Sequence, residues 1–156
     1  MGAGAIVRDA RPRMASDAPS TPRVLLRSEQ TDGRISVIET APRPGAGPPL
    51  HHHDFDESFY IMAGELTFQL RDELLTAGPG DLVFAPRGVP HTYANLSGAA
   101  AHQLIVCTPA GFERYFARIA AERRGVEPPE WALQPIPEVT KIGPPIRGRG
   151  VHGARR

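Results

Sequence analysis

The sequence predicts a single all-β domain with one helix on its C-terminal side. Between residues 23 and 108, short runs rich in β-branched and aromatic residues alternate with turns that contain Gly or Pro, which is typical of a barrel or a sandwich. After Pro109 the spacing of apolar residues changes to that of a helix. A chain of 156 residues is long enough for one hydrophobic core but not for two.

The expected strands are separated by turns with recognisable chemistry. The dipeptides at 32–33 (Asp-Gly) and 63–64 (Ala-Gly) each supply a residue that tolerates positive φ. Residues 77–81, AGPGD, end any regular structure before the next run. Strands are therefore expected near residues 23–28, 35–40, 48–53, 57–63, 65–71, 82–85, 91–95 and 102–108.

Residues 111–124, GFERYFARIAAERR, predict a surface helix that packs on the barrel and ends at Gly125. Its apolar face carries Phe112 and Phe116, and most of its charges lie on the other side. An aromatic stripe of this kind is expected to be core rather than the wall of a ligand site.

Three segments follow from the composition. Residues 1–22 are expected to form a flexible arm, residues 23–125 the barrel with its helix, and residues 126–156 a Pro/Arg-rich extension. Trp131 is expected to anchor the start of this extension on the domain. From Lys141 onward the chain is basic without any acid, which favours a solvated tail over a nucleic-acid or membrane contact.

Net charge and cysteine content exclude several roles. A formal charge of +1 gives no sign of a polyanionic partner, so neither nucleic acid nor membrane is an expected partner. No apolar segment near the N-terminus resembles a secretion signal, and a cytoplasmic location is expected. The one cysteine, Cys107, lies in an apolar run and is expected to be a small buried side chain.

Residues 45–64, GAGPPLHHHDFDESFYIMAG, contain the candidate site. Side chains two apart on a strand share a face, so His51, His53 and Glu57 can point the same way as Phe59 and Ile61. Two neutral imidazoles and a carboxylate are costly to bury unpaired, and a divalent cation removes that cost. The segment 80–95, GDLVFAPRGVPHTYAN, adds a further imidazole at the start of a strand.

Together these two segments resemble the cupin superfamily, whose motifs are G(X)5HXH(X)3–4E(X)6G and G(X)5PXG(X)2H(X)3N. The first motif is matched by Gly45, His51, His53, Glu57 and Gly64, and the second by Gly80, Pro86, Gly88, His91 and Asn95. An (X)4 spacing would place Leu50, which cannot bind a metal, in a ligand position.

The resemblance implies a jelly-roll type β-barrel that binds one divalent ion, with Fe, Mn, Ni, Zn, Co and Cu all accepted by such ligands. The implied ligands are His51, His53, Glu57 and His91. The motif glycines, with Pro86 and Asn95, are implied to be structural, and His52 is expected to face outward.

Other polar residues are weaker candidates. His102 is in phase with Leu104 and Val106. It is therefore either an acid/base group facing the cavity or a structural histidine whose hydrogen bonds are made within the core or at the sheet edge.

Tyr60 is out of phase with Glu57 and is expected to face away. The directions of Tyr93 and Gln69 are not fixed by the sequence, and Arg71 and Arg87 are expected to be surface charges.

The resemblance also implies a small-molecule enzyme. The function expected first is a dioxygenase that acts on an enol, phenolic or other aromatic substrate, with Glu57 both a ligand and an acceptor of the substrate's hydroxyl proton. The alternatives are a redox-neutral isomerase, cyclase, decarboxylase or lyase, and a cupin that only binds its ligand. A homodimer is expected, with the strand at 23–28 as the natural contact edge.

Overall fold

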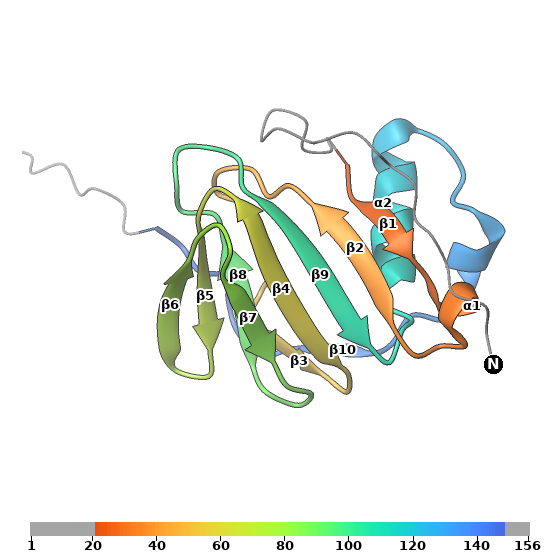
Figure 1. Ribbon diagram of the computed structural model, residues 1–156, viewed down its shortest axis with the longest axis horizontal. Helices are drawn as coiled ribbons and strands as arrows, with labels where there is room; N and C mark the ends of the chain where they lie inside the picture. Colours follow the sequence, from red (N-terminus) through yellow and green to blue (C-terminus); the bar gives the residue numbers. More distant parts are fainter. Residues whose placement is uncertain (1–20, 149–156) are drawn as a thin grey trace, which may run out of the picture.

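The computed structural model describes residues 21–148 and confirms the all-β fold. Two antiparallel sheets face each other, with strand orders β1-β2-β9-β4-β7 and β10-β3-β8-β5-β6 (Figure 1). The elements are β1 (Arg23–Leu26), α1 (Ser28–Thr31), β2 (Ser36–Thr40), β3 (His51–His53), β4 (Asp56–Ala63), β5 (Leu66–Leu70), β6 (Glu73–Ala77), β7 (Leu82–Ala85), β8 (His91–Ala94), β9 (His102–Thr108), α2 (Glu113–Arg124), the 3₁₀ helix η2 (Glu130–Leu133) and β10 (Val139–Lys141).

The core lies between the two sheets and follows the alternation of the strands. Phe59 and Ile61 of β4 meet Phe68 of β5 and Ile105 of β9, and none of these is more than 1 % exposed. Cys107 on β9 is fully buried beside them, and burial raises the pKa of its thiol well above the ordinary value. It is the small buried side chain that the sequence predicted.

Two strands were not predicted. β6 forms a hairpin with β5 and exposes most of its side chains, so it lacks the alternating pattern of a half-buried strand. β10 has three residues and pairs antiparallel with β3, so its existence depends on a partner nearly ninety residues away. Lys141, expected to begin a solvated tail, is instead the last residue of β10.

Helix α2 lies against β1 and β2, as expected, and ends at Gly125 with φ of 66° (Figure 1). The segment that follows is tied to it, because Arg118 donates hydrogen bonds to the carbonyls of Ala132 and Gln134, both at 2.7 Å. Trp131 anchors this segment as expected, with the Arg27 guanidinium 5.0 Å from the centre of its ring.

The expected arm lies outside the described residues apart from 21 and 22, as does the chain beyond 148. β1 is an edge strand of its sheet in the described part of the chain, and the homodimer expected through it stays a prediction. Within residues 21–148, no helix has the length and apolar character needed to span a membrane.

Glu113 joins the start of α2 to the start of α1. Its buried carboxylate accepts hydrogen bonds from the Ser28 backbone N–H at 2.7 Å, the Ser28 hydroxyl at 2.6 Å and the Gly111 N–H at 2.6 Å. Burial alone would raise the pKa of Glu113, but these donors outweigh it and leave the pKa below the ordinary 4.5.

Replacing Glu113 with Gln is therefore expected to lower the free energy of unfolding by about 2 kcal/mol at neutral pH, because one amide cannot accept from all three donors. Because folding lowers the pKa, the carboxylate stabilises the native state fully above its ordinary pKa and loses that effect as the pH falls through the lowered value. Urea unfolding at pH 7 and pH 3 measures both effects. Glu122→Gln, an exposed change on the same helix, should alter neither; a wild-type-like Glu113→Gln at pH 7 would contradict this role.

Candidate metal centre

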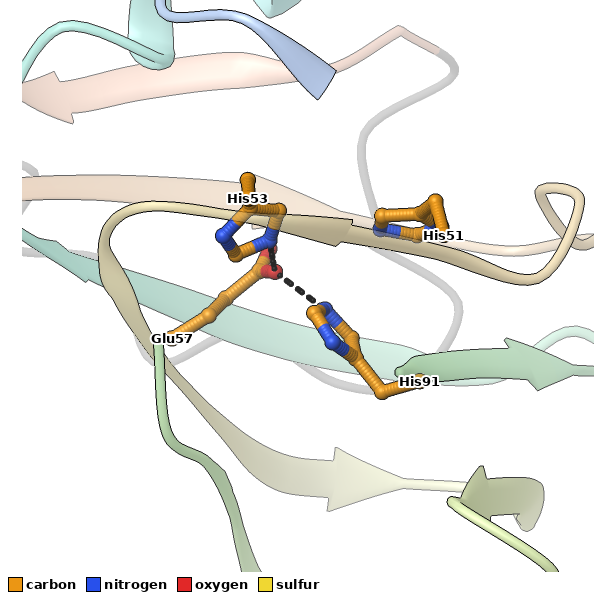
Figure 2. Close-up of side chains that lie close together, drawn as sticks. All are labelled: His51, His53, Glu57 and His91. Atoms are coloured by element: carbon orange, nitrogen blue, oxygen red, sulfur yellow. Dashed lines mark hydrogen bonds and ion pairs between the residues drawn. The ribbon is translucent and has the colours of Figure 1, made fainter. Parts of the chain in front are cut away.

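Three imidazoles and one carboxylate meet inside the barrel (Figure 2). His51, His53, Glu57 and His91 are all buried, and one donor atom from each lies within 4.8 Å of the others. The structure thus brings together the four residues of the two sequence motifs, in a cluster able to bind a metal ion.

The strand pairing explains this convergence. His51 and His53 are two residues apart on β3 and so share its inner face. His51 is paired directly with His91 of β8 in the same sheet, while Glu57 comes from β4 in the facing sheet. The carboxylate therefore approaches the imidazoles across the barrel. His52 lies between the two β3 histidines and points to the other face, as expected.

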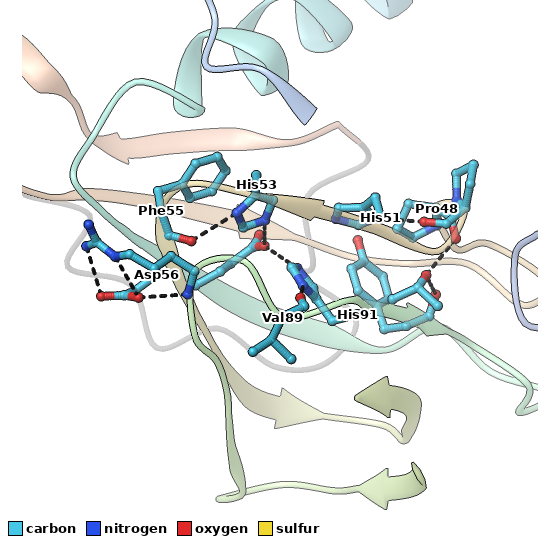
Figure 3. A network of polar contacts seen from close by, with 12 residues as sticks. Pro48, His51, His53, Phe55, Asp56, Val89 and His91 are labelled. Atoms are coloured by element: carbon cyan, nitrogen blue, oxygen red, sulfur yellow. Dashed lines mark hydrogen bonds and ion pairs between the residues drawn. The ribbon is translucent and has the colours of Figure 1, made fainter. Parts of the chain in front are cut away.

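Each imidazole has its Nδ1 atom occupied by a nearby backbone carbonyl (Figure 3). The distances are 2.7 Å from His51 to Pro49, 2.9 Å from His53 to Phe55 and 2.8 Å from His91 to Val89. Because a carbonyl can only accept, each Nδ1 carries a proton, and each neutral ring has its lone pair on Nε2. This is the second-sphere arrangement that holds metal-binding histidines in one tautomer.

The glutamate contacts confirm that the donor set fits a cation. The Nε2 atoms of His53 and His91 both lie 2.9 Å from the same Oε2 atom of Glu57. Burial alone would raise the pKa of Glu57, but when the two rings also carry a proton on Nε2 the hydrogen bonds that they donate outweigh it and hold the pKa at about 2. The pKa of His51 is lowered, mainly by burial, which favours its neutral form. Two lone pairs facing a carboxylate repel unless a proton or a metal ion lies between them.

A family model described as the cupin domain matches residues 40–107, the stretch that carries both motifs and all four donors. The double-sheet barrel and the histidine–glutamate cluster agree with it. This chain belongs to the cupin superfamily.

Individual relatives are distant. The cupin is 25 % identical over 104 residues to quercetin 2,3-dioxygenase of Bacillus subtilis strain 168, covering 66 % of this chain and 31 % of that enzyme. It therefore spans less than a third of that relative's length.

Among solved structures, TT1209 from Thermus thermophilus is 28 % identical with a TM-score of 0.50, covering 70 % of this chain and 98 % of that one. The polyketide cyclase RemF from Streptomyces resistomycificus is 22 % identical with a TM-score of 0.52, covering 63 % of this chain and 78 % of its own. At these identities, the second likeness concerns the fold alone.

Two residues of this histidine–glutamate cluster, His51 and Glu57, line a cavity of about 850 Å³. The walls include Phe59 and Ile105 from the barrel, Tyr115 and Phe116 from α2, and Phe112, which immediately precedes α2. Phe112 and Tyr115 are stacked, with ring centres 5.2 Å apart. The prediction that this aromatic stripe is core was wrong in part, because these three side chains also line the cavity.

His102 lies elsewhere. On β9 the inward positions are Gln103, Ile105 and Cys107. Leu104 and Val106 therefore do not face the cavity, although the sequence suggested that their face of the strand could be the inner one. His102 lies beside the carboxylate of Glu39, with 3.4 Å between Nε2 and Oε2, and it is not among the residues that line the cavity.

The remaining candidates are also placed. Tyr60 is exposed, as expected, and Gln69 points outward, donating to the Arg71 carbonyl at 2.9 Å. Tyr93 lines the cavity, and burial with the nearby charge of Glu57 raises the pKa of its phenol far above the ordinary value. Arg87 is the surface charge expected, paired with Asp56 at 3.1 Å.

Two contributions to the site were missed. Phe55 stacks on the His53 ring with centres 3.5 Å apart and planes inclined by 4°, and it fixes the orientation of that imidazole. The segment 136–141 closes one side of the cavity. The position of Phe55 two residues after His53 was a signal in the sequence for its role. Nothing in the sequence indicated the role of segment 136–141.

Proposed function

We propose that this cupin is a metal-dependent dioxygenase of an aromatic substrate that carries an enol or phenolic hydroxyl. The observation that carries the proposal is the cluster of three imidazoles, each with its Nε2 free of backbone contacts, and one carboxylate, beside a mainly apolar cavity that His51 and Glu57 line together with several aromatic side chains. For an ion that takes more than four ligands, such as octahedral Fe or Mn, these four protein ligands leave coordination positions open for exchangeable ligands. The likeness to quercetin 2,3-dioxygenase supports this choice of chemistry.

In this proposal His51, His53 and His91 hold the ion through Nε2, and Glu57 is the oxygen ligand. The bound metal would supply polarisation of the substrate's oxygen and a means of reacting with dioxygen. Glu57 is ionised at neutral pH and accepts the hydrogen bond, and then the proton, of the substrate's hydroxyl. The Tyr93 phenol stays protonated and donates a hydrogen bond that orients a second substrate oxygen.

The test is oxygen consumption by the metal-loaded protein with quercetin and simpler enols. We expect uptake that requires substrate and falls to background after chelation, with His52→Ala retaining the wild-type rate and His53→Ala losing it. Product formed at the same rate without oxygen would contradict the proposal and indicate a redox-neutral isomerase, cyclase, decarboxylase or lyase. Binding without product, with or without oxygen, would contradict it as well and indicate a ligand-binding cupin.

A further inference from the structure

The charges around the cavity are strongly unequal. Its lining contains three cationic side chains, Arg43, Lys141 and Arg123, which come from the loop before β3, from β10 and from α2. The only carboxylate in the lining is Glu57, and its contacts are to the histidine cluster. Among residues 21–148, no ion pair within 4.0 Å involves any of the three cations.

Lys141 has a position that the sheet fixes. In the antiparallel pairing of β10 with β3, Lys141 is opposite His51 and Val139 is opposite His53. Directly opposed residues project from the same face of a sheet, so Lys141 and Val139 are on the face that carries the two histidines. Both of them line the cavity, in agreement with this register. An ammonium group is thus available on the cavity face, beside a candidate metal ligand.

The other walls have a different character. Phe59, Ile105, Phe112 and Phe116 make the interior apolar, so the cations meet an otherwise hydrophobic space. A neutral apolar ligand would make no charged contact with the cations, which would stay hydrated. A small hydrated anion would make no contact with the aromatic walls. A ligand with an aromatic body and one anionic group matches both parts of the cavity.

We infer that the substrate of this site is an aromatic compound with a carboxylate or similar anionic group, which Lys141 binds, with Arg43 and Arg123 adding positive charge at the mouth. The inference rests on the proposed small-molecule function and names its substrate class. Lys141 is then a substrate-binding residue and not a metal ligand. A charge-assisted hydrogen bond of this kind should favour an acid over its neutral amide by about tenfold.

The experiment compares 2-naphthoate with 2-naphthamide by calorimetry, on protein with metal and after chelation, so that binding of the carboxylate to the ion is distinguished from binding to Lys141. The wild type should bind the acid about tenfold more tightly in both states. Lys141→Met should reduce the ratio to near one, while Lys141→Arg keeps it. Arg34→Met removes the same charge at an exposed site, where Arg34 is paired with Asp32 at 4.0 Å, and it should leave the preference for the acid unchanged.

Metal binding and circular dichroism of each variant are measured first. An acid preference that survives in folded Lys141→Met, or one that disappears for the wild type after chelation, would overturn the inference. A wild type that binds no metal would contradict the proposed function separately, because the preference for the acid in the metal-free protein is measured independently.

Discussion

Replacing His53 or Glu57 with alanine is expected to abolish metal retention by this protein. His53 contributes an Nε2 lone pair fixed by its Nδ1 contact to Phe55, and Glu57 contributes the oxygen that His53 and His91 both approach. Removing either one leaves three donors, and the metal affinity should fall by more than about a hundredfold, the upper end of the loss seen for second-sphere changes. Elemental analysis after dialysis against a weak chelator measures the retained metal.

His52→Ala is the matched control for this prediction. His52 lies between the two β3 ligands in sequence but points to the opposite face of the strand, and its alanine variant should retain the metal nearly as the wild type does. Retained metal in both His53→Ala and Glu57→Ala would show that the ligand assignment is incorrect.

Gly64→Ala is expected to destabilise the fold strongly. Gly64 follows β4 with φ of +76°, a conformation that L side chains rarely adopt. A Cβ atom there would lie 2.7 Å from the Cα of Ala101 and 2.9 Å from the carbonyl oxygen of Ala100. Because both contacts are to backbone, the two chains must separate, and strain and overlap together should lower the free energy of unfolding by about 3 kcal/mol or more.

Chemical denaturation of the metal-free protein isolates this effect from any change in metal binding. Gly78→Ala is the control, because no atom lies within 4 Å of its added Cβ and its φ is not in the left-handed region. Equal stability of the two variants would contradict the account of Gly64 as a position that requires glycine.

The candidate site was predictable partly from local strand geometry and partly from the spacing of the two motifs. Strand alternation places His51 and His53 on one face regardless of how the sheets pack, and motif spacing identified Glu57 and His91. Asn95 also fulfils its expected structural role, since its side-chain amide donates to the carbonyls of Pro42 and Ala99 at 2.8 and 2.7 Å.

The parts that were missed depend on contacts between distant segments. His102 is in phase with Leu104 and Val106 as predicted, but the sequence did not show which face of β9 is inside: the residues opposite Glu57, Phe59 and Ile61 of β4 are Cys107, Ile105 and Gln103. β10 exists only through its pairing with β3, and no pattern within three residues indicates it. The wall that Lys141 and Val139 contribute could therefore not be derived from the sequence.

The most direct test of the central claim is to titrate the metal-free wild-type protein with Co²⁺ or Mn²⁺ and to determine the ligands by X-ray absorption spectroscopy. We expect one ion per chain, bound by three imidazole nitrogens and at least one carboxylate oxygen. A folded protein that binds no ion, or one whose ion has no imidazole ligands, would contradict the account.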